Sequence, residues 1–251
     1  AEGRHYYVSA SRVGQGEGSL LLLQDDTADH EAEEGRRQFT ANVSHELRTP
    51  LTTISGYAEL LENHLAASPE DEEKFLSLIR KEAGRMLSLV EDILRLSQLD
   101  EGSLELKPQP VDVKRMAEDT AAALAAKAES RDVRLSVSGH APEVTTDATL
   151  LSEVLYNLLD NAIKYNRPGG QAEILLDDVN GHVRIRVKDT GIGIPKEHQQ
   201  KVFERFYRVD KSRSKATGGT GLGLSIVKHA AQILSADLRL DSTPNQGTTV
   251  T

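Results

Sequence analysis

The sequence predicts an α+β protein in which a helical hairpin is followed by an α/β two-layer sandwich. Two observations lead to this prediction. Apolar residues recur every three or four positions along two long stretches between residues 39 and 99, as in amphipathic helices. Beyond Pro108 and Pro110 this pattern gives way to shorter helical and extended segments. There we expect helices at 112–130, 148–165 and 221–234, and strands at 104–107, 133–138, 172–177, 182–188, 237–241 and 247–251, with the helices covering one face of a mixed sheet.

The first 27 residues are expected to contain two strands, at 5–10 and 19–24, with Gly14, Gly16 and Gly18 in the turn between them. A lone hairpin is only marginally stable in water. We therefore interpret residues 1–27 as the C-terminal remnant of a larger domain, with a disordered leader as the alternative. Residues 28–40 are rich in charge and are expected to form a solvated helical linker.

The second long helix has a clear start and a clear end. Ser68 is a good cap, Pro69 suits the first helical position, and acidic residues follow in the first turn. The apolar pattern stops near Asp100. Two such helices joined by a short turn form an antiparallel hairpin over residues 41–102. Because one hairpin cannot bury both apolar stripes, a dimeric four-helix bundle is expected.

Composition limits the possible functions. The chain has 251 residues, a net charge of −9 and no cysteine. The acidic balance argues against nucleic acid as a partner, because phosphate contacts need a basic surface. Without cysteine there is no disulfide, thiol nucleophile or cysteine metal site. No run approaches the roughly 20 apolar residues of a membrane span.

The first candidate site is the stretch Ser44-His45-Glu46-Leu47-Arg48-Thr49-Pro50 in the first long helix. His45 and Thr49 lie four residues apart and share a helix face. Pro50 cannot donate to the carbonyl of Glu46, so a bend is expected there. The functional interpretation of this stretch is a phosphoryl acceptor, with Glu46 as the base and Thr49 as a group that orients water, and it depends on the rest of the chain. The alternative is an ordinary solvated histidine beside a surface glutamate.

The second candidate site starts on the expected helix at 148–165. Glu153, Asn157 and Asn161 are spaced by four, and Lys164 follows three residues later, so all four share a face. Asparagine is a poor helix former. This arrangement favours a ligand such as a metal ion with phosphate oxygens, and an ordinary polar face is the alternative.

Two glycine-containing segments add to this site. The segment Asp189-Thr190-Gly191-Ile192-Gly193 follows a strand directly. The acid could accept a hydrogen bond from an amino group of a ligand, and the glycines would let the backbone come close to the ligand's ring. Gly219-Thr220-Gly221-Leu222-Gly223 opens a helix, where backbone N–H groups can bind phosphate. The polar segment 196–220 between them is expected to be a mobile lid.

Five segments resemble, in their order along the chain, the sequence boxes of sensor histidine kinases. They are the His45 stretch, the Asn157–Asn161 pair, the Asp189 segment, residues 203–208 and the Gly219 segment. The resemblance covers residues 36–251. It implies a dimerisation and histidine phosphotransfer domain at 41–102. An ATP-binding domain at 103–251, of the type shared with gyrase, Hsp90 and MutL, is implied after it. The exit of segment 1–27 into a charged helix resembles the end of a PAS sensor domain.

The resemblance also implies residue roles. His45 would accept the γ-phosphoryl group of ATP with Glu46 as base, Thr49 would support dephosphorylation of the partner, and Arg208 would approach the γ-phosphate. Asn157 would bind Mg²⁺. The remaining residues would bind the nucleotide: Asn161, Lys164, Tyr165 near adenine, Asp189 on the adenine amino group, Gly191, Gly193, Gly219, Thr220, Gly221, Leu222 and Gly223.

The function implied is an ATP-dependent kinase that phosphorylates its own His45 and passes the phosphoryl group to an aspartate of a response regulator, and that also acts as a phosphatase of that regulator. The expected partners are a second copy of the chain and a receiver domain. The resemblance further implies a full-length protein anchored in a membrane outside this fragment, with the fragment on the cytoplasmic side. The alternatives are a degenerate kinase that serves as a scaffold and an ATPase of the gyrase and Hsp90 type. One departure from the family is Leu234-Ser235-Ala236 where histidine-glycine-glycine is frequent.

Overall fold

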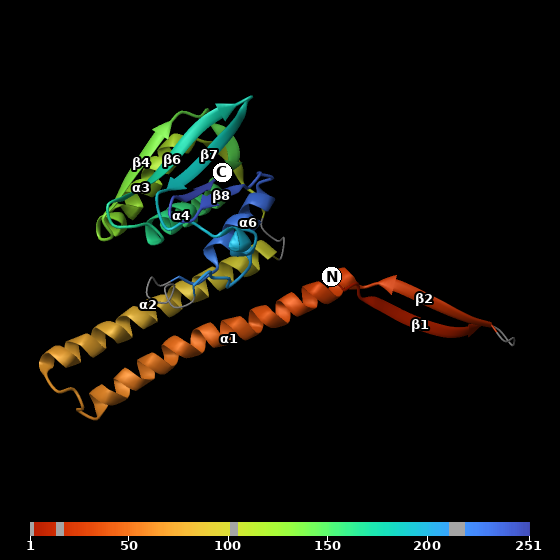
Figure 1. Ribbon diagram of the computed structural model, residues 1–251, viewed down its shortest axis with the longest axis horizontal. Helices are drawn as coiled ribbons and strands as arrows, with labels where there is room; N and C mark the ends of the chain where they lie inside the picture. Colours follow the sequence, from red (N-terminus) through yellow and green to blue (C-terminus); the bar gives the residue numbers. More distant parts are fainter. Residues whose placement is uncertain (1–2, 14–17, 101–104, 211–218) are drawn as a thin grey trace. The chain divides into compact units, whose positions relative to one another are not determined.

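The computed structural model describes residues 3–13, 18–100, 105–210 and 219–251 (Figure 1). Contacts between Cα atoms divide the chain into two compact units, Ala1–Glu82 and Ala83–Thr251. The long helix α2 (Pro69–Asp100) runs from one unit into the other. Among the described helices, none combines the length and the apolar character that a membrane span requires.

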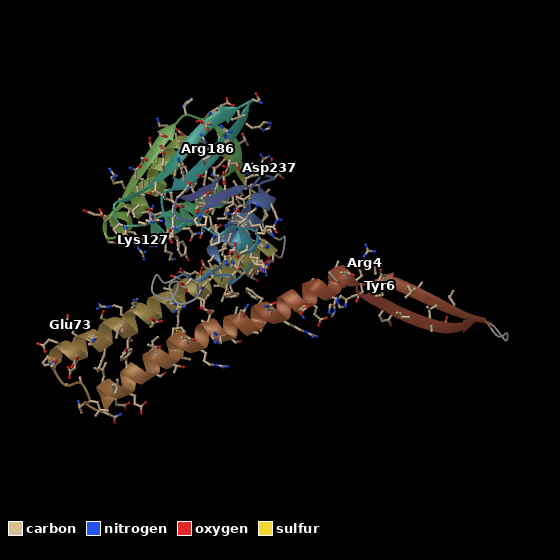
Figure 2. All side chains as sticks on the ribbon, viewed as in Figure 1. Arg4, Tyr6, Glu73, Lys127, Arg186 and Asp237 are labelled. Atoms are coloured by element: carbon tan, nitrogen blue, oxygen red, sulfur yellow. The ribbon has the colours of Figure 1, made fainter. Side chains whose placement is uncertain are left out.

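The first unit begins with an antiparallel hairpin of β1 (Tyr6–Val13) and β2 (Gly18–Asp25), as expected. Its turn residues Gly14 and Gly16 lie outside the described residues. Apolar side chains of the hairpin are largely exposed, including Tyr6 (labelled in Figure 2), Tyr7 and Leu20 to Leu23. An exposed two-stranded ribbon of this kind lacks the buried face that stabilises a sheet.

Helix α1 (Thr27–Glu62) follows the hairpin and continues through Pro50. The segment 28–40 is part of this helix, as expected for a helical linker. Helix α2 begins where predicted, since the Ser68 hydroxyl accepts a hydrogen bond from the N–H of Asp71 at 3.2 Å. The rings of Tyr57 and Phe75 lie 5.2 Å apart between the two helices. The predicted helical hairpin is therefore present.

The second unit contains a five-stranded sheet in the order β4-β6-β7-β9-β8, in which only β4 and β6 are parallel. Asn180 and Gly181 join β6 to β7 with φ values of 56° and 81°, as a tight hairpin turn requires. The bounds of the strands are β4 (Val133–Gly139), β6 (Gly170–Val179), β7 (His182–Asp189), β8 (Leu240–Thr243) and β9 (Gly247–Val250).

Among residues 105–210 and 219–251, the helices that accompany this sheet are α3 (Val113–Glu129), α4 (Ala148–Lys164) and α6 (Gly223–Ile233). Helices α3 and α4 pack on the sheet, and α6 packs on α4 (Figure 1). The core includes Leu155, Leu159 and Ile163 of α4 with Ile174 and Leu176 of β6, all at most 1% exposed. This two-layer arrangement is the predicted α/β sandwich.

The prediction of a strand at 104–107 was wrong. Residue 104 lies outside the described residues, and residues 105–107 are not in a strand. The strand is β3 (Pro108–Val111), which pairs antiparallel with β5 (Val144–Asp147) in a separate two-stranded sheet. Proline is tolerated in an edge strand, so Pro108 and Pro110 did not mark the end of structure here. Strand β5 was not predicted, and β8 begins at Leu240 rather than 237.

The unusual exit of α6 has a structural explanation. Ser235 adopts a φ of 54°, and the N–H of Ala236 donates to the carbonyl of Ala231 at 2.9 Å. This is the geometry of a Schellman motif, in which glycine is usual at the left-handed position. Ser235 therefore ends the helix in the conformation that a glycine usually adopts at this position.

Candidate functional site

The candidate phosphoacceptor helix presents His45 to solvent. The side chain of His45 is exposed, Glu46 and Thr49 are half-buried, and Pro50 is buried. The Thr49 hydroxyl donates to the backbone carbonyl of His45 at 3.4 Å, a long bond between residues one turn apart. The imidazole is therefore accessible to a second reactant, while the threonine hydroxyl faces the backbone of the same turn.

The candidate nucleotide site is built in the second unit, where Asp147 fixes the start of α4. Its carboxylate accepts hydrogen bonds from the N–H groups of Lys107, Thr149 and Leu150, each at 3.0 Å. These bonds lower the pKa of Asp147, and the bond from the N–H of Lys107 has the largest effect. The capping bonds at the start of α4 and the hydrogen bond from Lys107 position the helix that carries Asn157 and Asn161.

The polar face of α4 forms one wall of the site. Asn157, Asn161 and Lys164 are half-buried. The Nδ2 of Asn157 donates to the carbonyl of Glu153 at 3.0 Å, which leaves its Oδ1 as the acceptor. The Glu153 carboxylate is held by the guanidinium of Arg95 from α2, with Nε at 2.9 and 2.7 Å from its two oxygens.

Lys164 is a desolvated cation at this wall. Burial lowers the pKa of Lys164, and the nearby carboxylate of Asp160 opposes that shift. The Lys164 Nζ lies 3.7 Å from Asp160, which also contacts Lys127 of α3 (labelled in Figure 2). A β-carbon placed on Gly219 would stand 3.8 Å from the Lys164 Nζ, so this lysine adjoins the glycine-rich segment.

Asp189 lies at the end of β7 and is oriented by two backbone groups. Its Oδ1 accepts from the N–H of Gly191 at 2.8 Å and from that of Thr248 at 3.2 Å. Burial raises the pKa of Asp189 against the effect of these bonds. Since both bonds end on Oδ1, Oδ2 is the oxygen available to a ligand. Gly193, with a φ of 66°, turns the following loop toward Thr243.

Tyr165 connects the two glycine-containing segments. Its carbonyl accepts from the N–H of Ile192 at 3.1 Å, and the backbone of Gly191 packs against the same carbonyl. Its hydroxyl would lie 3.1 Å from a β-carbon on Gly219.

The segment Gly219 to Gly223 meets residues from three other parts of the unit. The hydroxyl of Thr220 donates to Asp92 of α2 at 2.7 Å. Gly221, with a φ of 78°, lies beside Arg208, whose Nε would be 3.2 Å from a β-carbon on the glycine. Leu222 is fully buried. Part of the lid expected at 196–220, residues 211–218, lies outside the described residues.

These residues surround one cavity of ≈ 830 Å³. The predicted residues that line it are Asn157, Asn161, Lys164, Tyr165, Asp189, Gly193, Arg208, Gly219, Thr220, Gly221 and Gly223. Gly191 and Leu222 do not line it and support the wall from behind. The sequence analysis missed the contribution of α2, which adds Ser88, Glu91 and Asp92. No local pattern could have found them, because Asp92 and Thr220 are 128 residues apart.

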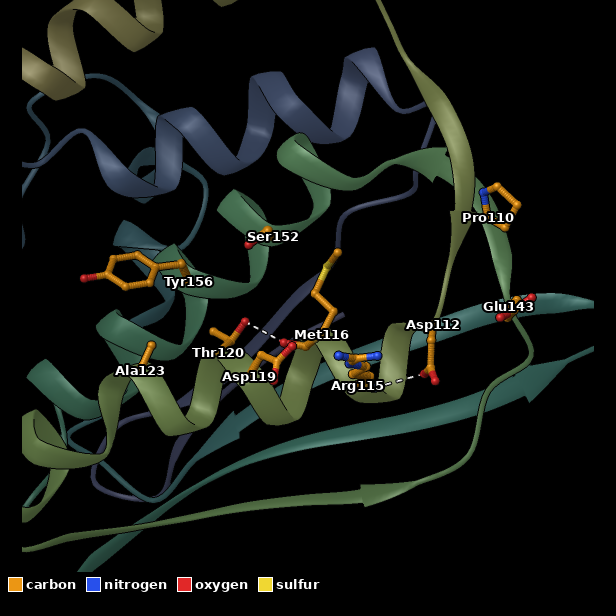
Figure 3. A pocket seen from close by; sticks show the side chains of 10 residues that line it. All are labelled: Pro110, Asp112, Arg115, Met116, Asp119, Thr120, Ala123, Glu143, Ser152 and Tyr156. Atoms are coloured by element: carbon orange, nitrogen blue, oxygen red, sulfur yellow. Dashed lines mark hydrogen bonds between the residues drawn. The ribbon is translucent and has the colours of Figure 1, made fainter.

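A second cavity of ≈ 560 Å³ lies elsewhere on the unit, along α3 and α4 (Figure 3). Its lining includes Asp112, Arg115, Met116 and Tyr156, with Thr120 bonded to the backbone of Met116. None of the predicted site residues lines it, although Tyr156 lines both cavities.

The side chains that line the first cavity suit a complex of Mg²⁺ with a nucleotide better than they suit a metal ion bound by protein side chains alone. Among the described residues, no group of three or more acidic, histidine or cysteine side chains could hold a metal. Mg²⁺ is commonly bound by one or two protein oxygens together with phosphate oxygens and water. The Oδ1 of Asn157 is such an oxygen, and the Lys164 cation can balance phosphate charge.

Comparison with known proteins matches both parts of the chain. Residues 35–102 match the His Kinase A (phospho-acceptor) domain, and residues 146–251 match the family described as histidine kinase-, DNA gyrase B-, and HSP90-like ATPase. The first segment contains His45, and the second contains the asparagine pair and both glycine-containing segments.

The chain belongs to the two-component sensor histidine kinases. It is 36% identical over 260 residues to the sensor histidine kinase WalK of Bacillus subtilis (strain 168), covering 98% of this chain and 41% of that protein. It is 35% identical over 235 residues to the sensor protein kinase WalK of Staphylococcus aureus, covering 93% of this chain and 57% of the relative. The chain thus spans about half the length of these relatives.

Solved histidine kinase structures have the same fold. Full-length ShkA in complex with AMPPNP matches with a TM-score of 0.62 and 29% identity, over 85% of this chain and 44% of that chain. The histidine kinase AdeS of Acinetobacter baumannii matches in fold with a TM-score of 0.65 at 24% identity, over 82% of this chain and 95% of that chain. These matches confirm the predicted order of domains in this histidine kinase: a helical hairpin followed by an α/β ATP-binding domain.

Proposed function

We propose that this chain phosphorylates its own His45 with ATP and passes the phosphoryl group to an aspartate of a response regulator. The observation that carries the proposal is the convergence of three distant segments on one cavity. Asn157 and Asn161, Asp189, and Gly219 to Gly223 surround it. The AMPPNP bound by the related ShkA supports ATP as the ligand.

Within this proposal the cavity positions the nucleotide. The Oδ2 of Asp189 accepts a hydrogen bond from the adenine amino group, with Tyr165 beside the ring. Lys164, Asn161 and the N–H groups of Gly219 to Gly223 hold the phosphates. Asn157 holds Mg²⁺, which when bound supplies charge neutralisation to the phosphates. Positioning and charge neutralisation are the main requirements of phosphoryl transfer.

The reaction on His45 follows from its chemistry. One ring nitrogen of the neutral imidazole attacks the γ-phosphorus, the bond from that phosphorus to the bridging oxygen breaks, and ADP leaves. Glu46 accepts the proton of the other ring nitrogen as positive charge develops. Arg208 stabilises the negative charge on the transferred group.

Thr49 has a separate proposed role in phosphatase activity. Its hydroxyl would orient the water that removes the phosphoryl group from the response regulator. This requires release of the 3.4 Å bond to the His45 carbonyl, a length that marks a weak interaction.

The proposal extends to domain organisation. Residues 1–27 would be the end of a PAS-like domain, 28–40 a linker, 41–102 the dimerisation and phosphotransfer domain, and 103–251 the catalytic domain. The match of 35–102 to the His Kinase A domain supports a homodimer. The relatives extend well beyond the matched region, which leaves room for a membrane anchor outside this chain, with the chain on the cytoplasmic side.

Incubation with ATP labelled on the γ-phosphate tests the proposal. We expect label that is stable to base and labile to acid, lost in His45→Gln and in Asp189→Asn and retained in the control His64→Gln. His45→Gln should still bind ATP, whereas Asp189→Asn should not. Bound ATP without any label would favour a scaffold, and release of free phosphate without protein label would favour an ATPase.

A further inference from the structure

The cavity has one wall that none of the glycine-containing segments supplies. Asp92 of α2 is half-buried in that wall, and its Oδ2 accepts the hydrogen bond from the Thr220 hydroxyl at 2.7 Å. A hydrogen bond to a carboxylate is charge-assisted and stronger than one between neutral groups. A carboxylate of α2 is therefore bonded to the segment whose N–H groups are proposed to hold the phosphates.

Asp92 also interacts with the phosphate-side cation. Burial raises the pKa of Asp92, while the Thr220 bond and the charge of Lys164 act in the opposite direction. The carboxylate of Asp92 in turn favours the charged form of Lys164. The Thr220 hydroxyl is thus bonded to Asp92, and the negative charge of Asp92 also acts on Lys164, the cation proposed to hold the phosphates.

Two ion pairs hold this part of α2 against the rest of the unit. Arg95 binds both oxygens of Glu153, and the Arg205 Nη2 donates to Asp100 at 2.6 Å. The side chains of Arg95 and Glu153 are only 21% and 18% exposed, so solvent screens this pair less than a surface pair. Asp92 is therefore kept at the cavity by contacts that do not involve the nucleotide site itself.

We propose that Asp92 is a residue that determines nucleotide affinity and specificity by competing with the phosphate chain for Thr220 and Lys164. This inference rests on the proposed function of the cavity. The repulsion between Asp92 and a ligand grows with the number of phosphate charges near it. Asp92 thus disfavours ATP more than ADP, and ADP more than AMP, and it leaves adenosine unaffected. By reciprocity, bound ATP weakens the hold of the nucleotide segment on α2.

Calorimetric titration of the whole chain with ATP, ADP, AMP and adenosine tests this inference. Asp92→Asn keeps an oxygen for the Thr220 hydroxyl but removes the charge, and we expect it to bind ATP about tenfold more tightly than wild type, with a smaller gain for ADP. Adenosine affinity should stay the same. Asp92→Ser removes the charge through a different side chain and should give the same order of gains, with circular dichroism as the check on folding.

The control is Glu118→Gln, which neutralises an exposed acid of α3 that lines neither cavity. Its removal should change ATP affinity less than twofold. Equal or weaker ATP binding in both Asp92 variants would overturn the inference and leave the proposed function standing. Equal gains for ATP and adenosine would overturn it too, because the effect would then not involve phosphate. Absence of nucleotide binding in every variant and in wild type would overturn the proposed function and the inference with it.

Discussion

Gly223 and Asn157 approach each other so closely that a β-carbon on the glycine would stand 2.8 Å from the Oδ1 of the asparagine. The same β-carbon would be 3.8 Å from the Nδ2 of Asn161. The asparagine amide cannot swing away without losing its bond to the carbonyl of Glu153. The first residue of α6 thus sets the position of the amide oxygen proposed to hold Mg²⁺.

We therefore expect Gly223→Ala to weaken the binding of ATP with Mg²⁺ roughly tenfold, since overpacking of this kind costs about 1–3 kcal/mol. Titration calorimetry measures the affinity. Gly84→Ala in α2 is the matched control, because no atom beyond the adjoining residues and backbone of its own helix lies within 4 Å of its added β-carbon. That control should leave ATP affinity unchanged. Normal affinity in Gly223→Ala would show that Asn157 can be repositioned at little cost.

Asp189 should make adenosine binding depend on pH. Both backbone N–H groups bond Oδ1, so a proton added on acidification goes to Oδ2, the oxygen proposed to accept from adenine. Because burial raises the pKa of Asp189 above its ordinary value of 3.8, adenosine affinity should start to fall at a higher pH than an ordinary aspartate would give. Affinity measured across the acid range checks this, and a decline that begins only below 3.8 would contradict it.

The same raised pKa has a consequence for stability. The folded state binds the proton of Asp189 more tightly than the unfolded state does, so the favourable contribution of this group is present below 3.8 and is lost as pH rises through the raised pKa. We expect Asp189→Asn at neutral pH to lose nucleotide binding and yet to resist denaturant as well as or better than wild type. A lower denaturant midpoint would mean that the loss of binding reflects unfolding.

Asp147 should be a large contributor to the stability of the second unit. Asp147→Ala removes a buried acceptor of three backbone N–H groups, and we expect a loss of about 2 kcal/mol in the free energy of unfolding. Asp112→Ala, which removes an exposed cap of α3 with one N–H bond, should cost about half as much. Denaturant midpoints of the two variants give the comparison, and equal losses would contradict the role assigned to the bond from Lys107.

The exposed apolar stripe of α2 should mediate dimerisation. Leu87, Val90 and Leu94 are 61%, 40% and 59% exposed, while Leu89 and Leu96 on the other face are buried. Burial of a leucine contributes roughly 1.5–3 kcal/mol, so Leu87→Ala with Leu94→Ala should weaken the dimer by a hundredfold or more. Analytical ultracentrifugation over a concentration series measures this, with Lys81→Ala, an exposed polar position of the same helix, as the control. A monomeric wild-type chain at micromolar concentration would refute the proposed dimer.

Thr49 and Glu46 should separate the two proposed activities. Thr49→Ala removes the hydroxyl proposed to orient water, so it should retain phosphorylation of His45 and lose dephosphorylation of the response regulator. Glu46→Gln removes the proposed base and should lose mainly the kinase step. The decay of purified phosphorylated regulator and the labelling of His45 are the two measurements.

Thr52→Ala is the control for this pair. Its hydroxyl makes the same kind of bond, to the carbonyl of Arg48 at 2.9 Å, but lies farther along the helix from His45. It should leave both activities unchanged. Equal decay rates with wild type and Thr49→Ala would mean that Thr49 only bonds its own helix.

The local elements of this protein were determined by short-range sequence patterns. The cap at Ser68 and the apolar periodicity of α2 each depend on residues within a few turns, and the structure has them where the sequence predicts them. The motif residues from Asn157 to Gly223 could be proposed for the same reason. The prediction at β3 was wrong because proline is tolerated in an edge strand only where the strand has a partner. That partner, β5, is distant in sequence: the paired residues Pro108 and Asp147 are 39 positions apart.

Tertiary structure alone decided which of these segments meet. The sequence contains nothing that pairs Asp92 with Thr220 or Arg95 with Glu153, because these contacts join residues separated by 128 and 58 positions. Only the packing of residues 83–100 of α2 within the second unit brings them together. Burial likewise separates carboxylates that are identical in sequence: it raises the pKa of Asp92 and Asp189, whereas backbone N–H groups lower that of Asp147. Charge and hydrogen bonding depend on distance in space, which the order of residues along the chain does not specify.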